Sequence, residues 1–202
     1  MTEEEYPTVP LRAIFFRRFC MTKEQPLRII GLLWVAGEGE IGWSKLDLQD
    51  DPTAVRQAGD VWCEAASGEM LLADRGIKAT QHSIVKLTGI TDKGINEGML
   101  IRVLTTLDTT GKYDWRGGLV FIPGVEAKHV FRSLNTTGTW GAIIRTQSGY
   151  LHMVVVNGLD SRGRVIIRDP AEGKRYHTPL DEFLQYWTEM AVYAFPLRAK
   201  NG

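Results

Sequence analysis

The most constraining feature of this sequence is a cysteine at the start of a predicted amphipathic helix. Four residues recur at the spacing of one helix face: Cys63, Ala66, Met70 and Ala73. Asp60 is predicted to cap the first turn, and Gly76 is expected to end the helix. A thiol in the first turn feels the positive end of the helix dipole, which favours a reactive thiolate. The alternative is a small buried cysteine that only packs among alanines.

Composition is that of an ordinary globular protein and excludes several classes of function. The 202 residues are 44% hydrophobic, and 24 basic side chains balance 24 acidic ones. Without a net charge, neither nucleic acid nor a membrane is expected as a partner. Cys20 and Cys63 do not indicate a disulfide framework, although a bridge between them is an open alternative. These two cysteines and the four scattered histidines do not show the spacing of metal ligands, so no metal or other cofactor is expected.

The N-terminal sequence predicts where the protein is made. Residues 1–5 are acidic and lack the basic and apolar regions of a signal peptide. The longest apolar run, residues 29–36, is too short to cross a bilayer. We therefore expect a cytoplasmic, reduced protein in the producing cell.

The sequence is divided at residue 50. Residues 11–19 and 27–36 are apolar and aromatic and predict strands, so residues 1–50 are assigned to a β-rich N-terminal extension or subdomain. A pro-segment or part of a substrate groove are alternatives for this region. Residues 51–202 are assigned to the main domain.

Within the main domain, helices are expected first and strands afterwards. Beyond the cysteine helix, helices are predicted over 81–87, 95–107 and 125–134, and from a cap at Thr178 through Trp187. Strands are predicted over 119–122, 139–146, 151–159, 164–168 and 190–195. Helices followed by an antiparallel sheet predict an α+β fold.

Two of these strands supply partners for a nucleophilic cysteine, which needs a base and a group that orients the base. His152 opens one strand, and Asp169 ends the next. If the turn is centred on Asp160 and Ser161, the two residues lie directly opposite on one face, with Cβ atoms about 5 Å apart. A bulged turn would shift this register by one residue.

Each residue also has a simpler interpretation. His152 is alternatively a solvated strand end, and Asp169 before Pro170 is alternatively only a turn. His177, in a polar run after Gly173, is a weaker candidate for the base. The combination of cysteine, histidine and aspartate favours the catalytic interpretation.

Gln57 lies six residues before Cys63 and is the candidate for binding an oxyanion. Its side-chain amide, together with the backbone N–H of Cys63, would stabilise negative charge on a reacting carbonyl oxygen. Taken alone, a glutamine in a polar loop does not predict this role.

These segments resemble the papain-like cysteine peptidases. In detail they are similar to the branch that contains bacteriocin-leader-processing peptidases and bacterial papain-like effector proteases. The matching segments are residues 57–77, 151–158, 163–170 and 180–187, and the resemblance covers about residues 55–195. It implies a papain-like fold, in which an N-terminal helical part with the nucleophile at a helix start packs on an antiparallel sheet.

The resemblance also implies a role for each site residue. Cys63 attacks, His152 is the base, the aspartate of the Asp169–Pro170 pair orients His152, and Gln57 contributes to the oxyanion hole. The sequence departs from the family at Glu64, where relatives more often have a small residue or tryptophan. Because adjacent residues on a helix diverge by about 100°, we expect Glu64 to point away from the thiol.

The expected function is a cysteine peptidase that cleaves a protein or peptide through a thioester acyl-enzyme. No transporter segment follows the domain, which favours a free-standing enzyme or a bacterial toxin exported into a target cell without a cleaved signal peptide. Family analogy adds a neutralising immunity protein as a partner. A glutamine deamidase or an acyl transferase on the same apparatus, and a catalytically silent papain-like binding module, are the alternatives.

Overall fold

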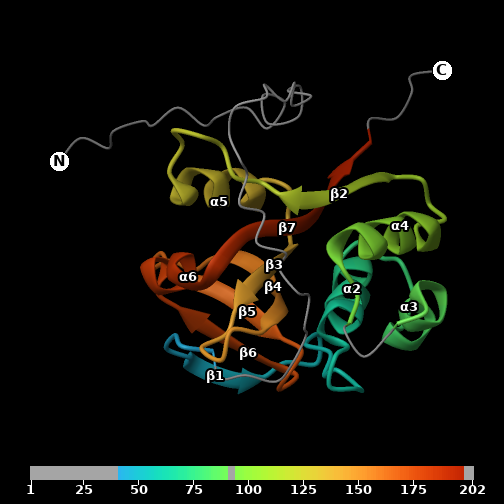
Figure 1. The fold of residues 1–202 in the computed structure, drawn as a ribbon, viewed down its shortest axis with the longest axis horizontal. Coiled ribbons are helices and arrows are strands. Elements are labelled where there is room, and N and C mark those ends of the chain that lie inside the picture. The colour runs from blue at the N-terminus through green and yellow to red at the C-terminus, as the bar shows by residue number, and fades with distance from the viewer. Residues whose placement is uncertain (1–40, 91–93, 198–202) are drawn as a thin grey trace.

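A computed structural model of the chain describes residues 41–90 and 94–197. The strands in these residues are β1 (Leu46–Asp50), β2 (Tyr113–Leu119), β3 (Trp140–Arg145), β4 (Leu151–Leu159), β5 (Val165–Asp169), β6 (Lys174–Thr178) and β7 (Trp187–Pro196). They form one sheet in the order β1-β6-β5-β4-β3-β7-β2, with every neighbouring pair antiparallel (Figure 1).

The helices in the same residues are α2 (Cys63–Ala73), α3 (Gln81–Thr88), α4 (Glu97–Leu107), α5 (Ala127–Asn135) and α6 (Leu180–Tyr186). In Figure 1, α2, α3 and α4 gather at one side of the sheet, whereas α5 and α6 lie apart from them. The α+β fold predicted from the sequence is confirmed. None of the helices in the described ranges has the length and hydrophobicity needed to span a membrane.

The central strand β4 divides the core into two layers. Met153 and Val155 pack in a cluster with residues of α2, α3 and α4, whereas Val154 and Val156 pack in a second cluster with residues of α5 and α6. Successive side chains of a strand point to opposite faces, so one continuous apolar run supplies both layers. This arrangement fixes the end of β4, where His152 lies, against both halves of the core.

Helix α2 begins at Cys63, as predicted, but its first turn is not capped by Asp60. Trp62 occupies the N-cap position and makes no side-chain capping bond. Its backbone N–H instead donates to Gly59 O at 3.1 Å, closing a turn before the helix. The inward stripe is also broader than predicted, because α2 is buried on most sides while Ala73 is exposed.

Most other elements lie within three residues of their predicted ends: α3, α4, α5, β3, β4, β5 and β7. The chain after α2 turns at Gly76, which has a φ of 73°. Helix α3 ends at Gly89, which has a φ of 61°. Both conformations are left-handed and favour glycine. Thr80 caps α3 through a reciprocal pair of hydrogen bonds with Ser83.

Two further predictions about local structure are wrong, and two strands were missed. The strand expected over 119–122 ends at Leu119 instead, because β2 pairs with β7 through the polar residues before it. Thr178 does not cap α6: it ends β6, and Pro179 takes the cap position without a side-chain bond. The sheet strands β1 and β6 were not predicted, because both are short and rich in polar residues.

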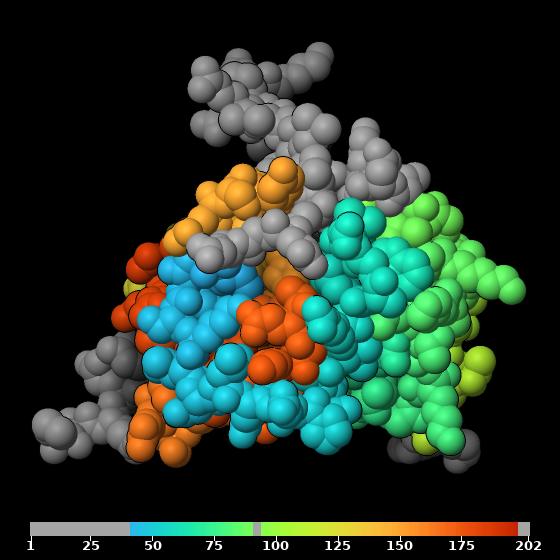
Figure 2. All heavy atoms as spheres, turned by 90° about the horizontal axis from the view of Figure 1, so that it is seen from below, coloured from blue at the N-terminus to red at the C-terminus, as the bar shows by residue number. Residues whose placement is uncertain are grey.

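Within the described part of residues 1–50, Leu46–Asp50 form a strand of the sheet. β1 pairs with β6 at the sheet edge, and the Trp43 ring stacks on Phe183 with a centroid distance of 5.4 Å. Figure 2 shows the blue residues of this part of the chain, together with the cyan residues that follow them, lying around an orange patch from the later strands. The strands predicted over 11–19 and 27–36 lie outside the described residues, and the domain division at residue 50 stays a prediction.

Gly117 in β2 provides a test of the β2–β7 pairing. A Cβ at Gly117 would overlap the backbone oxygen of Ala191 on β7. We expect Gly117→Ala to force the strands apart and to lower the free energy of unfolding by about 2 kcal/mol, measured by urea denaturation.

Gly98→Ala in α4 is the matched control, because a Cβ there would approach only Asn96 Oδ1, at 3.4 Å. The helix propensity of alanine should leave the free energy of unfolding unchanged or raise it by up to about 1 kcal/mol. An equal decrease in the free energy of unfolding of the two variants would contradict the proposed close approach of β2 and β7 at Gly117.

Candidate active site

His152 and Asp169 meet at one end of the sheet. His152 Nε2 donates to Asp169 Oδ1 at 2.8 Å, and both residues are buried, with exposed fractions of 5% and 0%. Because Nε2 is engaged, Nδ1 is the ring nitrogen that remains for proton exchange. The structure therefore brings together the histidine and aspartate that the sequence paired.

The register that was predicted for this pair is wrong. Val156 lies opposite Ile167. When this register is continued along the two strands, Asp169 lies opposite Val154 rather than His152. The cause is a longer turn with a bulge, since Asp160 N–H donates to Arg164 O at 2.9 Å. His152 and Val154 share a sheet face, so the contact survives as a diagonal one.

Asp169 is held by donors from several elements. Its Oδ1 also accepts from the Ala171 N–H at 3.0 Å, and its Oδ2 accepts from the Tyr176 hydroxyl at 3.0 Å. Lys45 Nζ lies 4.0 Å from Oδ2. Burial alone would raise the pKa of Asp169, but His152, Lys45 and the Ala171 N–H hold it below its ordinary value.

Tyr176 stays a neutral donor within this network. Its hydroxyl accepts from Trp43 Nε1 at 3.2 Å and donates to Asp169. Burial and the Asp169 charge raise the pKa of Tyr176 well above its ordinary value. Asp169 is therefore an ionised acceptor at neutral pH, fixed on both oxygens.

Cys63 is buried at the first turn of α2, with an exposed fraction of 2%. Its thiol donates to Glu64 Oε2 at 3.2 Å. Burial and the Glu64 carboxylate raise the pKa of Cys63 well above its ordinary value, although a hydrogen bond from the Met153 backbone opposes them. The thiolate expected from the helix start is therefore not favoured in this structure.

The prediction that Glu64 points away from the thiol is wrong. Glu64 has an exposed fraction of 0%, and its carboxyl group contacts Sγ. The predicted divergence applies to the Cα–Cβ directions, whereas the long glutamate side chain turns back through its rotatable bonds. Sequence reasoning located the residue but missed its contact.

Cys63 and His152 converge on the same place without a direct hydrogen bond between them. The thiol contacts the backbone of Met153, the residue next to His152. His152 also acts on Glu64, lowering the pKa of the carboxyl group that touches the thiol. Cys63, His152 and Asp169 therefore form one cluster at the junction of α2 and β4.

Gln57 lies in the loop that leads to α2. Its backbone N–H donates to Pro170 O at 2.8 Å, which ties the loop to the residue after Asp169. Its side-chain Nε2 donates to Gly59 O at 3.0 Å and to Asp60 O at 3.2 Å. Both amide hydrogens face loop carbonyls in this structure, and the oxyanion role of Gln57 stays a prediction.

Two buried side chains that sequence reasoning missed hold this loop in place. Gln81 accepts from the Ala58 N–H at 2.8 Å and donates to Arg56 O at 2.9 Å. Arg168, with an exposed fraction of 1%, donates to three acceptors: Thr53 O, Asn157 Oδ1 and the Asp74 carboxylate. Neither side chain stands in a recognisable motif, so no local sequence signal identifies them.

His177, the weaker candidate for the base, belongs to a different environment. It lies on β6 opposite Leu46, and its Nδ1 is 3.5 Å from Asp47 Oδ2. His152 is thus the histidine that the structure places with Cys63.

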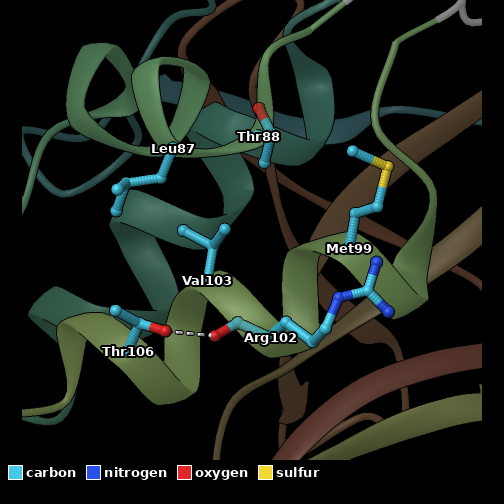
Figure 3. A pocket seen from close by; sticks show the side chains of 6 residues that line it. All are labelled: Leu87, Thr88, Met99, Arg102, Val103 and Thr106. Carbon is cyan, nitrogen blue, oxygen red and sulfur yellow. Dashed lines mark hydrogen bonds between the residues drawn. The ribbon is translucent and has the colours of Figure 1, made fainter.

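A hollow of about 240 Å³ lies between α3 and α4. Figure 3 shows its lining side chains: Leu87 and Thr88 from α3, and Met99, Arg102, Val103 and Thr106 from α4. The Thr106 hydroxyl is bound to Arg102 O at 2.9 Å and so remains on its own helix. None of the four predicted site residues lines this hollow.

Comparison with known proteins identifies the family. The model of the Peptidase_C39 like family matches residues 49–195. The chain belongs to this family.

Relatives agree with this family assignment. The chain is 35% identical over 160 residues to "Cysteine protease effector 1" of Escherichia coli O1:K1:H7, covering 77% of this chain. It spans only 30% of the length of that relative.

Two solved structures share the C39 fold. The peptidase domain of Streptococcus ComA, a bifunctional ABC transporter of a quorum-sensing pathway, is 18% identical and matches 71% of this chain and 97% of its own, with a TM-score of 0.58. A double-glycine-motif protease from an AMS/PCAT transporter, in complex with a leader peptide, is 20% identical. The match covers 79% of this chain and 99% of that protease, with a TM-score of 0.54. These likenesses confirm the papain-like fold that the resemblance implied.

Asp169 should make the stability of this C39-like chain depend on pH. We expect Asp169→Asn to lower the free energy of unfolding at pH 7 by about 3 kcal/mol, because it removes a buried acceptor of several donors. The folded pKa of Asp169 is below its unfolded value, so its contribution is present at pH 7 and is lost as the pH falls through the folded pKa, below about 4.

The measurement is urea unfolding of both proteins at pH 7 and pH 3, and the difference between their free energies of unfolding should be smaller at pH 3. Asp114→Asn is the control, since its ion pair with Arg116 is partly exposed and should contribute less than about 1 kcal/mol. A difference between wild type and Asp169→Asn that is the same at both pH values would contradict the assignment.

Proposed function

We propose that this chain is a cysteine peptidase in which Cys63, His152, Asp169 and Gln57 form the catalytic site. The observation that carries the proposal is the buried His152–Asp169 pair beside Met153, whose backbone contacts the Cys63 thiol. Membership of the C39-like family supports the same assignment. A protein or peptide is the proposed substrate, since a relative of the same fold was solved with a leader peptide.

The chemistry follows from the side chains in place. His152 Nδ1 takes the Cys63 proton, and the thiolate attacks a peptide carbonyl to form a tetrahedral adduct. The backbone N–H of Cys63 and, after leaving its loop carbonyls, the Gln57 amide stabilise the oxyanion. The imidazolium then donates its proton to the leaving amine, and a thioester acyl-enzyme remains.

Hydrolysis of the acyl-enzyme uses the same residues in reverse. Neutral His152 removes a proton from water, the hydroxide oxygen attacks the thioester, and the carboxylic acid leaves as Cys63 regains its proton. Asp169 keeps the ring oriented throughout and stabilises the imidazolium that forms.

We further propose that the domain acts as a bacterial effector. The E. coli relative carries that description in its name. Delivery into a target cell and a neutralising immunity protein in the producing cell belong to this proposal. Both follow from family analogy rather than from a contact in the site.

The test is proteolysis of a denatured proteome, read by mass spectrometry of new N-termini. We expect Cys63→Ala to abolish cleavage and His152→Ala to slow it by about 10²-fold or more, because general base catalysis is lost. His177→Ala is the matched histidine control and should retain the wild-type rate. Products that change amide to acid without chain cleavage would assign the site to deamidation instead.

A further inference from the structure

The buried carboxyl group of Glu64 has no place in the mechanism above. Its Oε2 accepts from the Cys63 thiol at 3.2 Å, whereas its Oε1 is buried without a hydrogen-bond partner among the described residues. Burial of a carboxylate oxygen without a hydrogen-bond partner costs free energy of folding, so such a group in a folded protein calls for an explanation.

A second carboxyl group acts electrostatically on this one. Glu97, at the start of α4, has its Oε2 buried and also without a partner in the described part of the chain. Glu97 disfavours ionisation of Glu64, whereas His152 on β4 favours it. Cys63 on the same helix, His152 and Glu97 are the ionisable groups that act on Glu64, and Asp169 stands behind His152.

We propose that Glu64 is a proton-operated brake on Cys63, which as a carboxylate holds the thiol away from His152 and releases it on taking up a proton. This inference rests on the proposed function, because it concerns the same nucleophile and base. It assigns to Glu64 a regulatory role in the reaction rather than a role in bond cleavage.

The two states differ by one proton taken from solvent and one proton moved within the site. With Glu64 ionised, the proton stays on sulfur and is donated to Oε2. When Glu64 is protonated, it no longer competes as an acceptor, and the thiol proton passes to His152 Nδ1. The Glu64 hydroxyl group then donates to the thiolate, which replaces repulsion by a charge-assisted hydrogen bond.

The chemistry of the site supports a change near neutral pH. Burial, opposed by the Cys63 thiol and His152, raises the pKa of Glu64 to about 7. Because an ionised Glu64 raises the pKa of Cys63, the two titrations are coupled. The thiol is therefore restrained above neutrality and released in a mildly acidic environment.

The experiment measures the rate of Cys63 alkylation by iodoacetamide from pH 5 to 9, in a Cys20→Ala background so that one thiol reports. We expect Glu64→Gln to react about tenfold faster than the parent protein at pH 8, which corresponds to one unit of thiol pKa. The ratio of the two rates should fall towards one at pH 5, where Glu64 of the parent protein is neutral.

A purely structural role for Glu64 would change the rate without this pH dependence. A rate ratio that is constant from pH 5 to 9, or a slower reaction of Glu64→Gln at pH 8, would overturn the proposal. Glu126→Gln, which removes an exposed carboxylate paired with Lys128, is the matched control and should follow the parent protein at every pH.

Glu97→Gln keeps the proposal testable if Glu64→Gln does not fold. Removing the Glu97 charge should lower the Glu64 pKa, so the brake should release at a lower pH than in the parent protein. An unchanged release pH would count against the proposal. His152→Ala separates this inference from the proposed function. If that variant keeps the alkylation profile of the parent protein, His152 does not act on Cys63, and the proposed function itself fails.

Discussion

The buried carboxylate of Asp169 is the constraint around which this end of the molecule is built. A charge removed from water must be matched by donors, and these come from β4, from the turn after β5, from β6 and from the segment before β1. Each donor fixes the position of the element that carries it. The orientation of His152 is therefore a property of the whole sheet edge rather than of one hairpin.

The same demand explains why the segment before β1 is part of the site. Trp43 donates to Tyr176, Tyr176 donates to Asp169, and Lys45 adds a positive charge nearby. Trp43 also packs on Phe183 of α6, in the core layer that holds Val154 and Val156 of β4. A polar network and an apolar cluster thus stabilise each other through one tryptophan.

At Cys63 the balance of forces is different. The helix dipole favours a thiolate at Cys63, whereas burial and the adjacent Glu64 carboxylate raise the pKa of the thiol well above its ordinary value. Asp169 thus holds His152 in a fixed orientation, whereas deprotonation of Cys63 is disfavoured. The proposed brake is reversible, because it comes from a group that itself takes up a proton.

The amino-acid sequence by itself determined the α+β class, most helices and strands, and the identity of the Cys63, His152 and Asp169 cluster. These follow from local periodicity, turn residues and spacing, which act over a few neighbouring residues. Tertiary structure alone decided the β4–β5 register, the polar strands β1 and β6, and the contact of Glu64 with the thiol. Strand pairing and burial depend on residues far apart in the chain, so no local pattern specifies them.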